Sequence, residues 1–275
     1  MNITAAQVNE LRQMTGAGMM DCKKALVECN GDYEAAIDYL RKKGQKIAAK
    51  RADREAAEGC VLSKTTEDNT FAAVVMLNCE TDFVGANSDF VNCTKEILDF
   101  AVANKIKDID TLKSASLNGR PIEDHITDLS GKTGEKVQLG KYFALEAPFV
   151  TNYNHQGNRL ATIVAFNKTF NGIKEIAHEV ALQIAAMDPI SIDENDVPAD
   201  VKQREMEIGM EQARNEGKPE AMLEKIAMGK LNKFYKTNTL LHQDSLIAEG
   251  KSVKEYIQAG DKDATVIAFY RVKLG

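Results

Sequence analysis

The sequence of 275 residues contains no tryptophan, and aromatic side chains make up only 6% of it. Apolar runs are short as well, and none approaches the roughly 18 consecutive apolar residues that a membrane-spanning helix requires. The N-terminal residues MNITAAQVNELRQM have neither the apolar core of a secretion signal nor the Arg- and Ser-rich composition of a transit peptide. We therefore expect a cytosolic protein that does not bind membranes.

Cysteine and histidine are too scattered along the chain to indicate a metal site. The five cysteines contain no C-x-x-C pair, and none of the four histidines belongs to an H-x-x-x-H or H-E-x-x-H pair. Small buried thiols in a reducing compartment are the expected state of the cysteines. The sequence also has no Ser/His/Asp signature and no carboxylate pair that stands out from ordinary surface charge. We therefore expect a protein that is not an enzyme and holds no cofactor.

The net charge of −6 is spread unevenly, because residues 41–54 (RKKGQKIAAKRADR) carry seven basic residues and one acid. A solvated linker or an exposed helix is the common explanation of such a run. The functional alternative is an acidic partner, either protein or nucleic acid. No aromatic side chain lies among these charges to stack on bases, so an RNA partner is less favoured than a protein partner. An RNA-binding or ribosome-associated module that uses residues 41–54 remains the alternative function.

The first forty residues predict a small three-helix domain. Thr4 and Gln7 have the spacing of a capping box at the start of a helix. Gly31 suits the left-handed position after a helix end, and Asp32 can cap the next helix. We expect a helical domain at residues 1–40, followed by a basic linker at residues 41–56.

The rest of the chain alternates short apolar runs with helical stripes, which predicts an α+β core with antiparallel sheets. The expected strands are residues 71–77, 142–145, 160–166 and 265–272, with a shorter candidate at 61–62. The expected helices are residues 89–104 and 173–187. We divide the core into one subdomain at residues 57–150 and a second at residues 151–197 and 237–275.

A weak internal repeat supports this division. NTFAAVVMLN (residues 69–78) and NRLATIVAFN (residues 158–167) match at four of ten positions, and each precedes an amphipathic helix. Two related strand-then-helix halves would explain the match, and chance agreement between two apolar strands would explain it as well.

Residues 198–236 predict an inserted antiparallel helical hairpin, a short coiled coil that projects from the core. The segment is rich in Met and Ala and is interrupted at residues 216–219 (EGKP). Gly favours a helix end and Pro a helix start, which places the turn between two helices there. We interpret the methionines of this segment as packing between the two helices rather than as a ligand surface.

The segment TGAGMMDCKK resembles a phosphate-binding loop only superficially. Gly16 and Gly18 are present, but no strand precedes them, Asp21 stands where a third glycine is needed, and no G-K-[ST] follows. We expect a tight turn between two helices and no direct nucleotide binding. Met19 and Met20 are adjacent and cannot both face a core, so one of them is expected on the surface, as part of a protein-binding site.

The segment TDFV (residues 81–84) allows two interpretations. Thr81 or Asp82 could cap a short helix, with Phe83 folded back against it as a hydrophobic staple. Alternatively, the turn holds Phe83 outward as an aromatic anchor for another protein.

Two segments together resemble the signature motifs of the elongation factor Ts family, the nucleotide-exchange factors of the GTPase elongation factor Tu. They are LRQMTGAGMMDCKKAL (residues 11–26) and NCETDFV (residues 78–84). The resemblance covers nearly the whole chain. It implies a ubiquitin-associated-like helical domain, a two-part core and an inserted hairpin. It also implies that elongation factor Tu is the partner and makes nucleic acid the less favoured one.

The resemblance also implies a mechanism, in which the TDFV segment enters the GTPase near its bound Mg²⁺ and phosphates and promotes release of GDP. Phe83 would wedge between helices of the partner, and Asp82 would disturb the surroundings of the ion. Thr81 and Val84 complete the inserted segment.

Further partner contacts are implied by position. Met19, Met20 and Lys23 would contact the GTPase domain of the partner from the N-terminal domain. His155 would contact another partner domain, and Thr133 with Gly134 would form an additional contact loop.

The sequence departs from the family pattern at a few places. Gly85 stands where alanine is usual, which we expect to loosen the turn after Phe83. Asn158 and Ala161 replace usual glycines near His155. The chain ends directly after its last expected strand, so we expect it to lack the C-terminal partner contact that some bacterial members have.

Overall fold

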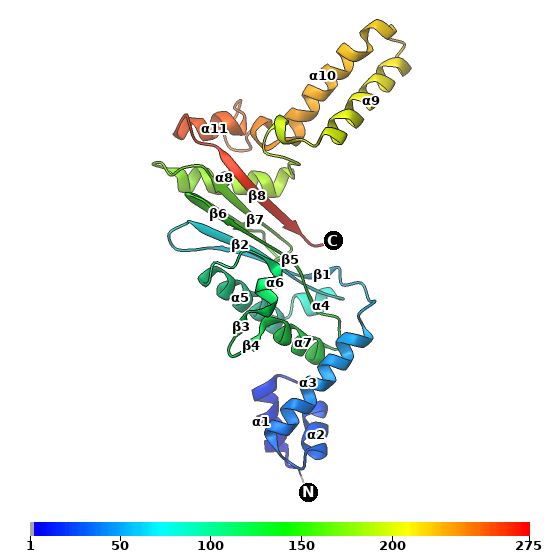
Figure 1. Ribbon diagram of the computed structural model, residues 1–275, viewed down its shortest axis with the longest axis vertical. Coiled ribbons are helices and arrows are strands. Elements are labelled where there is room, and N and C mark those ends of the chain that lie inside the picture. Colours follow the sequence, from blue (N-terminus) through cyan, green and yellow to red (C-terminus); the bar gives the residue numbers. More distant parts are fainter. Residues whose placement is uncertain (1–2) are drawn as a thin grey trace.

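The computed structural model describes residues 3–275, which form an elongated molecule with three parts in a row (Figure 1). A helical head lies at one end, an α+β core lies in the middle, and a helical hairpin projects from the far side of the core. Within residues 3–275 no helix combines the length and the apolar character needed to cross a lipid bilayer.

The head consists of three helices, as the sequence predicts: α1 (Ala5–Thr15), α2 (Met19–Glu28) and α3 (Tyr33–Lys50). The capping box is present, since Gln7 N–H donates to the Thr4 hydroxyl at 3.3 Å and Thr4 N–H donates to the Gln7 side chain at 3.0 Å. The three helices enclose a small apolar cluster of Val8, Leu11, Ala17, Cys22, Ala25, Leu26 and Ala36.

Helix α3 does not end where the head was expected to end. It continues to Lys50, so residues 41–50 of the expected linker are helical. Lys, Arg, Gln and Ala dominate this stretch and are good helix formers. The buried face of the extension packs against α7 (Ile122–Thr133), where Gly44 lies against Gly131. The basic run is therefore an extension of α3 that contacts the core, followed by a short connection to the first strand.

The core contains two three-stranded antiparallel sheets, in agreement with the predicted α+β class. The first has the order β1-β2-β5, with β1 (Glu58–Thr65), β2 (Phe71–Cys79) and β5 (Gln138–Glu146). The second has the order β6-β7-β8, with β6 (Phe149–Asn154), β7 (Leu160–Phe166) and β8 (Val266–Lys273). Two short strands, β3 (Ser116–Leu117) and β4 (Arg120–Pro121), pair separately.

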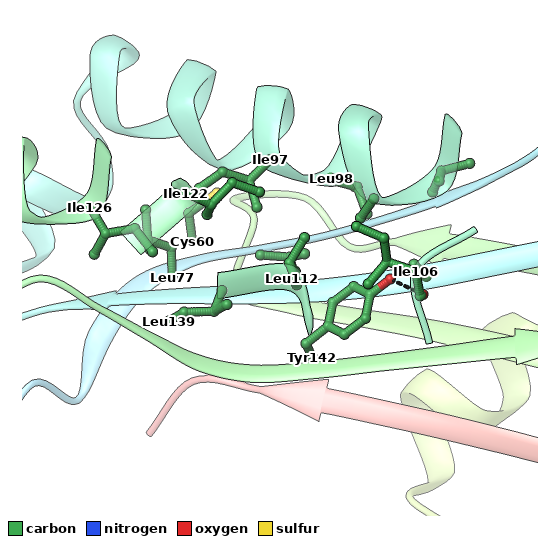
Figure 2. Close-up of a cluster of buried hydrophobic side chains, with 14 of the residues drawn as sticks. Cys60, Leu77, Ile97, Leu98, Ile106, Leu112, Ile122, Ile126, Leu139 and Tyr142 are labelled. Carbon is green, nitrogen blue, oxygen red and sulfur yellow. Dashed lines mark hydrogen bonds between the residues drawn. The ribbon is translucent and has the colours of Figure 1, made fainter. Parts of the chain in front are cut away.

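Helices cover the outer face of each sheet. Those of the first half are α4 (Asp82–Gly85), α5 (Ser88–Ala103), α6 (Ile109–Ser114) and α7. Those of the second half are α8 (Ile173–Met187) and α11 (Val253–Gly260), with 3-10 turns at Glu194–Asp196 and Leu240–His242. Figure 2 shows the cluster between α5 and the first sheet, closed at one end by the Tyr142 hydroxyl, which donates to the Ile106 carbonyl at 2.6 Å.

The two halves share one topology, which supports the internal repeat. In each half two antiparallel strands are followed by a helix, and a third strand returns to pair with the second. The repeated segments coincide with β2 and β7, the central strands of the two sheets. The matched residues keep their roles, since Val75 and Val164 face the helices, whereas Ala72 and Ala161 face the opposite sheet.

The sheets stack face to face, which explains the unbroken apolar run in β2. All nine residues of β2 are buried. Alternate side chains such as Phe71 and Val75 face α5, and those between them, such as Val74, face the second sheet at Ile163. A strand covered on both faces needs no polar positions.

The projecting hairpin consists of α9 (Ala199–Asn215) and α10 (Glu220–Asn238). Its buried residues are Gly209, Ala213, Leu223, Ala227 and Leu231, and a β-carbon on Gly209 would lie 3.0 Å from the Ala227 Cα. The expectation that methionines fill this contact is wrong for Met222 and Met228, each of which is 48% exposed. The close approach of the two backbones leaves no room for those longer side chains.

Candidate functional site

The turn that carries Phe83 combines features of both sequence-based interpretations. Thr81 is the N-cap of α4, and its hydroxyl accepts from Val84 N–H at 3.4 Å. Phe83 does not fold back as a staple, because its side chain is 85% exposed. Val84 is the apolar residue of the turn that packs against the first-half core. The turn therefore holds a large aromatic ring in solvent at a fixed place.

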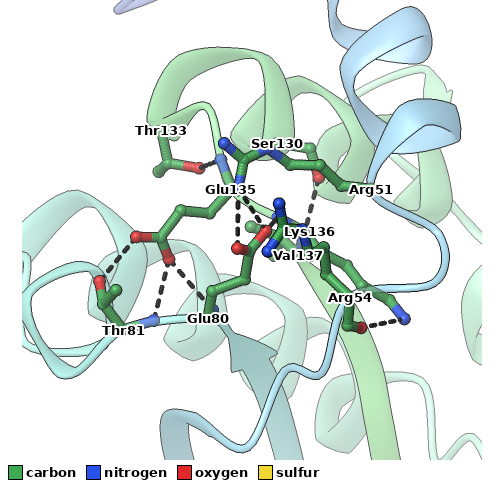
Figure 3. A network of polar contacts seen from close by, with 9 residues as sticks. All are labelled: Arg51, Arg54, Glu80, Thr81, Ser130, Thr133, Glu135, Lys136 and Val137. Atoms are coloured by element: carbon green, nitrogen blue, oxygen red, sulfur yellow. Dashed lines mark hydrogen bonds and ion pairs between the residues drawn. The ribbon is translucent and has the colours of Figure 1, made fainter.

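The carboxylate of Glu135 holds this turn from the side (Figure 3). One of its oxygens accepts from the backbone N–H groups of Glu80 and Thr81, at 3.0 and 3.1 Å. The other accepts from the Thr81 hydroxyl at 2.6 Å. Glu135 lies in the loop between α7 and β5, which β5 brings beside β2. Three donors from two consecutive residues thus converge on one side chain.

Glu80 makes the reciprocal contact. Its carboxylate accepts from Lys136 N–H at 2.6 Å and from the Arg51 guanidinium at 2.7 and 2.8 Å. These donors lower the pKa of the Glu80 carboxyl group, the Lys136 N–H first and Arg51 second. The Lys136 ammonium in turn donates to the Ala52 and Arg54 carbonyls. We call this set of contacts among residues 51–54, 80–81 and 135–136 the clasp.

Gly85 corrects one expectation from the sequence. The glycine does not loosen the turn, because Gly85 is buried against β1, and a β-carbon there would lie 2.8 Å from the Gly59 carbonyl oxygen. Gly59 has φ of 145° and is itself too close to the Leu77 carbonyl to carry a side chain. The absence of both side chains lets α4 lie directly on the β1 backbone.

Asp82 is exposed beside Phe83 and has a cation from the second half of the core nearby. Arg159, at the start of β7, donates to the Glu58 carboxylate. Glu58 raises the pKa of Arg159, and Asp82 adds to that effect. The ion pair of Arg159 with Glu58 joins the β6–β7 turn to β1, the strand on which α4 lies.

His155 is exposed in the same β6–β7 turn and shares a hydrogen bond with the Tyr153 hydroxyl at 2.9 Å from Nδ1. Asn158 adopts φ of 55°, a left-handed conformation that asparagine tolerates better than most residues. Its carbonyl accepts from Val61 N–H at 2.8 Å, and Ala161 is buried between the sheets. The backbone of the β6–β7 turn is thus attached to β1 at Asn158.

Thr133 and Gly134 end α7 directly before Glu135. Gly134 has φ of 72° at the helix C-cap, and the Thr133 hydroxyl accepts from Glu135 N–H at 3.2 Å. The structure thus joins the predicted contact loop to the TDFV turn through the clasp.

Met19, Met20 and Lys23 lie on the head, at and after the start of α2. Both methionines are exposed, Met19 by 52% and Met20 by 74%, whereas the sequence predicts that at least one of them is on the surface. Lys23 is exposed one turn further along. These residues belong to a different part of the molecule from the clasp.

Thiols and metal ligands add nothing to this surface. Within residues 3–275 all five cysteines are free, and no group of His, Cys, Asp and Glu is arranged to hold a metal ion. Burial, and then the charge of Glu135, raises the pKa of the Cys79 thiol to about 12. The protonated thiol lies 3.1 Å from the Thr81 carbonyl oxygen and donates to it.

The supporting roles of Arg51, Glu80, Glu135 and Lys136 are not evident from the sequence. Arg51 lies in the basic run and Glu80 in NCETDFV, but neither pattern predicts their contact, and Glu80 is separated from its partners in the clasp by 29 and 56 residues. Only the register of β2 against β5 brings them together.

The head, the two-part core and the exposed aromatic turn define a modular α+β protein that presents apolar side chains on the head and on the Thr81–Val84 turn. Comparison with known proteins identifies the family. A model described as Elongation factor TS matches residues 80–275, and one described as UBA/TS-N domain matches residues 3–40. The chain belongs to the elongation factor Ts family.

Similar proteins cover the whole chain. Elongation factor Ts of Christiangramia forsetii and that of Flavobacterium psychrophilum are each 47% identical over 273 residues, spanning 99% of both chains. Elongation factor Ts of Cytophaga hutchinsonii is 48% identical over 274 residues, again with 99% of each chain covered. The matches extend through the head, the core and the hairpin.

Proposed function

We propose that the protein promotes release of GDP from elongation factor Tu by inserting its Thr81–Val84 turn beside the bound Mg²⁺ and phosphates. Membership of the elongation factor Ts family supports the choice of partner. One observation carries the proposed role of the turn: Phe83 is 85% exposed on a backbone that is held in place from several sides. Leaving a phenylalanine in water gains nothing for folding, so a binding role explains its position.

The proposed mechanism follows from linkage. A protein that binds the nucleotide-free GTPase more tightly than the GDP-bound form must weaken GDP binding by the same factor. Mg²⁺ and phosphate contacts are the strongest electrostatic terms in such a site. Phe83 would separate partner elements beside them, and the Asp82 carboxylate would compete for the surroundings of the ion. No covalent step by this chain is required.

The remaining predicted residues would extend the contact. Met19, Met20 and Lys23 offer an apolar and basic surface on the head. Thr133 and Gly134 lie beside the inserted turn, and His155 is exposed on the second half of the core. Each of these would contribute to binding rather than to displacement of the ion.

The test is release of a fluorescent GDP analogue from purified elongation factor Tu. Phe83→Ala should leave the fold intact and slow stimulated release about tenfold or more, as expected for loss of an interface anchor worth about 1.4 kcal/mol or above. Leu246→Ala is a matched control, since Leu246 is also exposed but lies far along the chain, before α11. Normal release with folded Phe83→Ala would contradict the wedge role.

Asp82→Ala should slow release less than Phe83→Ala. An exposed charge contributes modestly to binding. An equal loss for the two variants would give the carboxylate a role as large as that of the ring and contradict this order.

A further inference from the structure

We infer that Glu135 is the positioning residue of the TDFV turn: its carboxylate fixes the place of Phe83 by holding the backbone in front of it. The effect of Glu135 on GDP release rests on the proposed function, whereas its contacts with the turn do not. The Glu135 side chain accepts the Glu80 and Thr81 N–H groups at 3.0 and 3.1 Å and the Thr81 hydroxyl at 2.6 Å.

Helix α4 cannot hold this conformation by itself. It has four residues, which is about one turn, and the first turn of a helix is unfavourable in isolation. The Thr81 cap bond is long, at 3.4 Å. An ionised carboxylate that accepts several N–H and O–H donors forms hydrogen bonds roughly twice as strong as neutral pairs. Gly85 and Val84 hold the C-terminal side of this turn by packing, and Glu135 holds its N-terminal side, directly before Phe83.

Reciprocal contacts keep Glu135 in register. The residue before the turn, Glu80, accepts from the residue after Glu135, Lys136, at 2.6 Å. The two segments thus exchange hydrogen bonds in both directions, and neither can slide without breaking both. Arg51, at the end of α3, forms an ion pair with the Glu80 carboxylate.

The contact geometry makes the effect of each substitution at Glu135 distinct. Alanine removes all three acceptor contacts. Glutamine keeps the length of the side chain: its carbonyl can accept the two N–H groups, and its amide can donate to the Thr81 hydroxyl. Because these bonds are neutral and weaker than those of a carboxylate, Glu135→Gln should restore part of what Glu135→Ala loses.

Because the chain contains no tryptophan, Phe83→Trp provides a single fluorescent reporter on the turn itself. We expect Glu135→Ala in this background to lower the fluorescence anisotropy of the indole, and Glu135→Gln to give a value between those of Glu135→Ala and the parent. Glu123→Ala, at an exposed glutamate at the start of α7, is the control that should change nothing. Unchanged anisotropy in the Glu135→Ala variant overturns the inference without reference to any partner.

The functional readout is release of the fluorescent GDP analogue from elongation factor Tu. If Glu135→Ala leaves the turn in its competent position about a tenth of the time, stimulated release should slow about tenfold, because apparent affinity scales with the competent fraction. In the Phe83→Ala background, Glu135→Ala should add less than about a twofold further loss, since a residue that acts through Phe83 has nothing left to position.

The outcomes separate the two proposals. Normal release with Phe83→Ala contradicts the wedge role, while the anisotropy measurement still decides the role of Glu135. Slow release with Phe83→Ala but normal release with Glu135→Ala overturns the positioning role. Independent, multiplicative losses in the double variant would assign Glu135 a general structural role and overturn the inference as well.

Discussion

Gly44 in α3 and Gly131 in α7 are in direct backbone contact, and a β-carbon on Gly131 would lie 2.9 Å from the Gly44 Cα. The helix that leaves the head thus packs backbone to backbone on the core. A long helix fixed at its middle by such a contact orients the whole head relative to the core.

Gly131→Ala should therefore loosen the attachment of the head. The added methyl group meets backbone, which cannot rotate away, and overpacking of this kind costs about 1–3 kcal/mol. We expect faster trypsin cleavage within the basic residues 41–54 and a larger radius of gyration in small-angle scattering. Gly229→Ala in α10 is the control, since nothing lies within 4 Å of its added β-carbon. Cleavage and scattering that match the parent protein would show that α3 is held mainly by other contacts.

Gly85→Ala should destabilise the fold although the residue lies in a surface turn. Its β-carbon would meet the Gly59 carbonyl oxygen at 2.8 Å, so α4 must shift away from β1. We expect the free energy of unfolding in urea to fall by about 1–3 kcal/mol. Ala86→Ser adds one atom at the exposed neighbouring position and should leave stability unchanged. Equal stability of both variants would mean that the Gly59 backbone can move aside.

The clasp should make stability depend on pH in the acid range. Lys136 N–H and Arg51 hold the pKa of Glu80 below its ordinary value of 4.5. A carboxyl group whose pKa is lowered by folding stabilises the fold at pH values above its pKa in the unfolded state. That contribution is lost as the pH falls through its pKa in the folded state. The free energy of unfolding in urea should thus be lower for Glu80→Gln than for the parent protein at pH 7. This difference should shrink below about pH 4. A deficit of constant size across this range would exclude the ionised carboxylate as its cause.

The exposed face of α3 provides a test of the RNA-binding alternative. Lys42, Lys46 and Lys50 lie one turn apart, and none of them is in an ion pair within residues 3–275. A protein that neutralises 6–10 phosphates loses about 10³–10⁵ in affinity between 50 and 200 mM salt, whereas mixed apolar docking weakens only moderately. We expect binding to elongation factor Tu to fall less than about tenfold over this range. RNA binding that disappears with salt and with replacement of the three lysines by glutamate would favour the alternative instead.

The sequence predicts the helices and strands that have a strong periodicity of apolar residues or a clear capping residue. The helices at α5 and α8 and the strands at β2 and β7 lie close to their expected positions, because each buries an apolar face of its own. Strand β6 (Phe149–Asn154) is not predicted, since only its first two residues are buried and the rest is half-exposed. The end of α3 is misplaced, because charge alone does not distinguish a linker from an exposed helix.

The candidate site is predictable only in its local part. The order of Thr81, Asp82 and Phe83 is visible as a motif, and so is the cap. What keeps Phe83 outward is not visible, because the supporting carboxylate of Glu135 comes from a loop 54 residues away and reaches the turn only through strand pairing.

The shared topology of the two halves has a consequence for how this architecture can change. In both halves the extra elements occur between the covering helix and the returning third strand: α6 to α7 in one, and α9 to α11 in the other. In the first half this gap holds helices that pack on the core and lead into the loop of Glu135, and in the second half it holds the hairpin and α11. Of these elements only the hairpin α9–α10 projects from the core, so its length can change while the stacked sheets stay as they are.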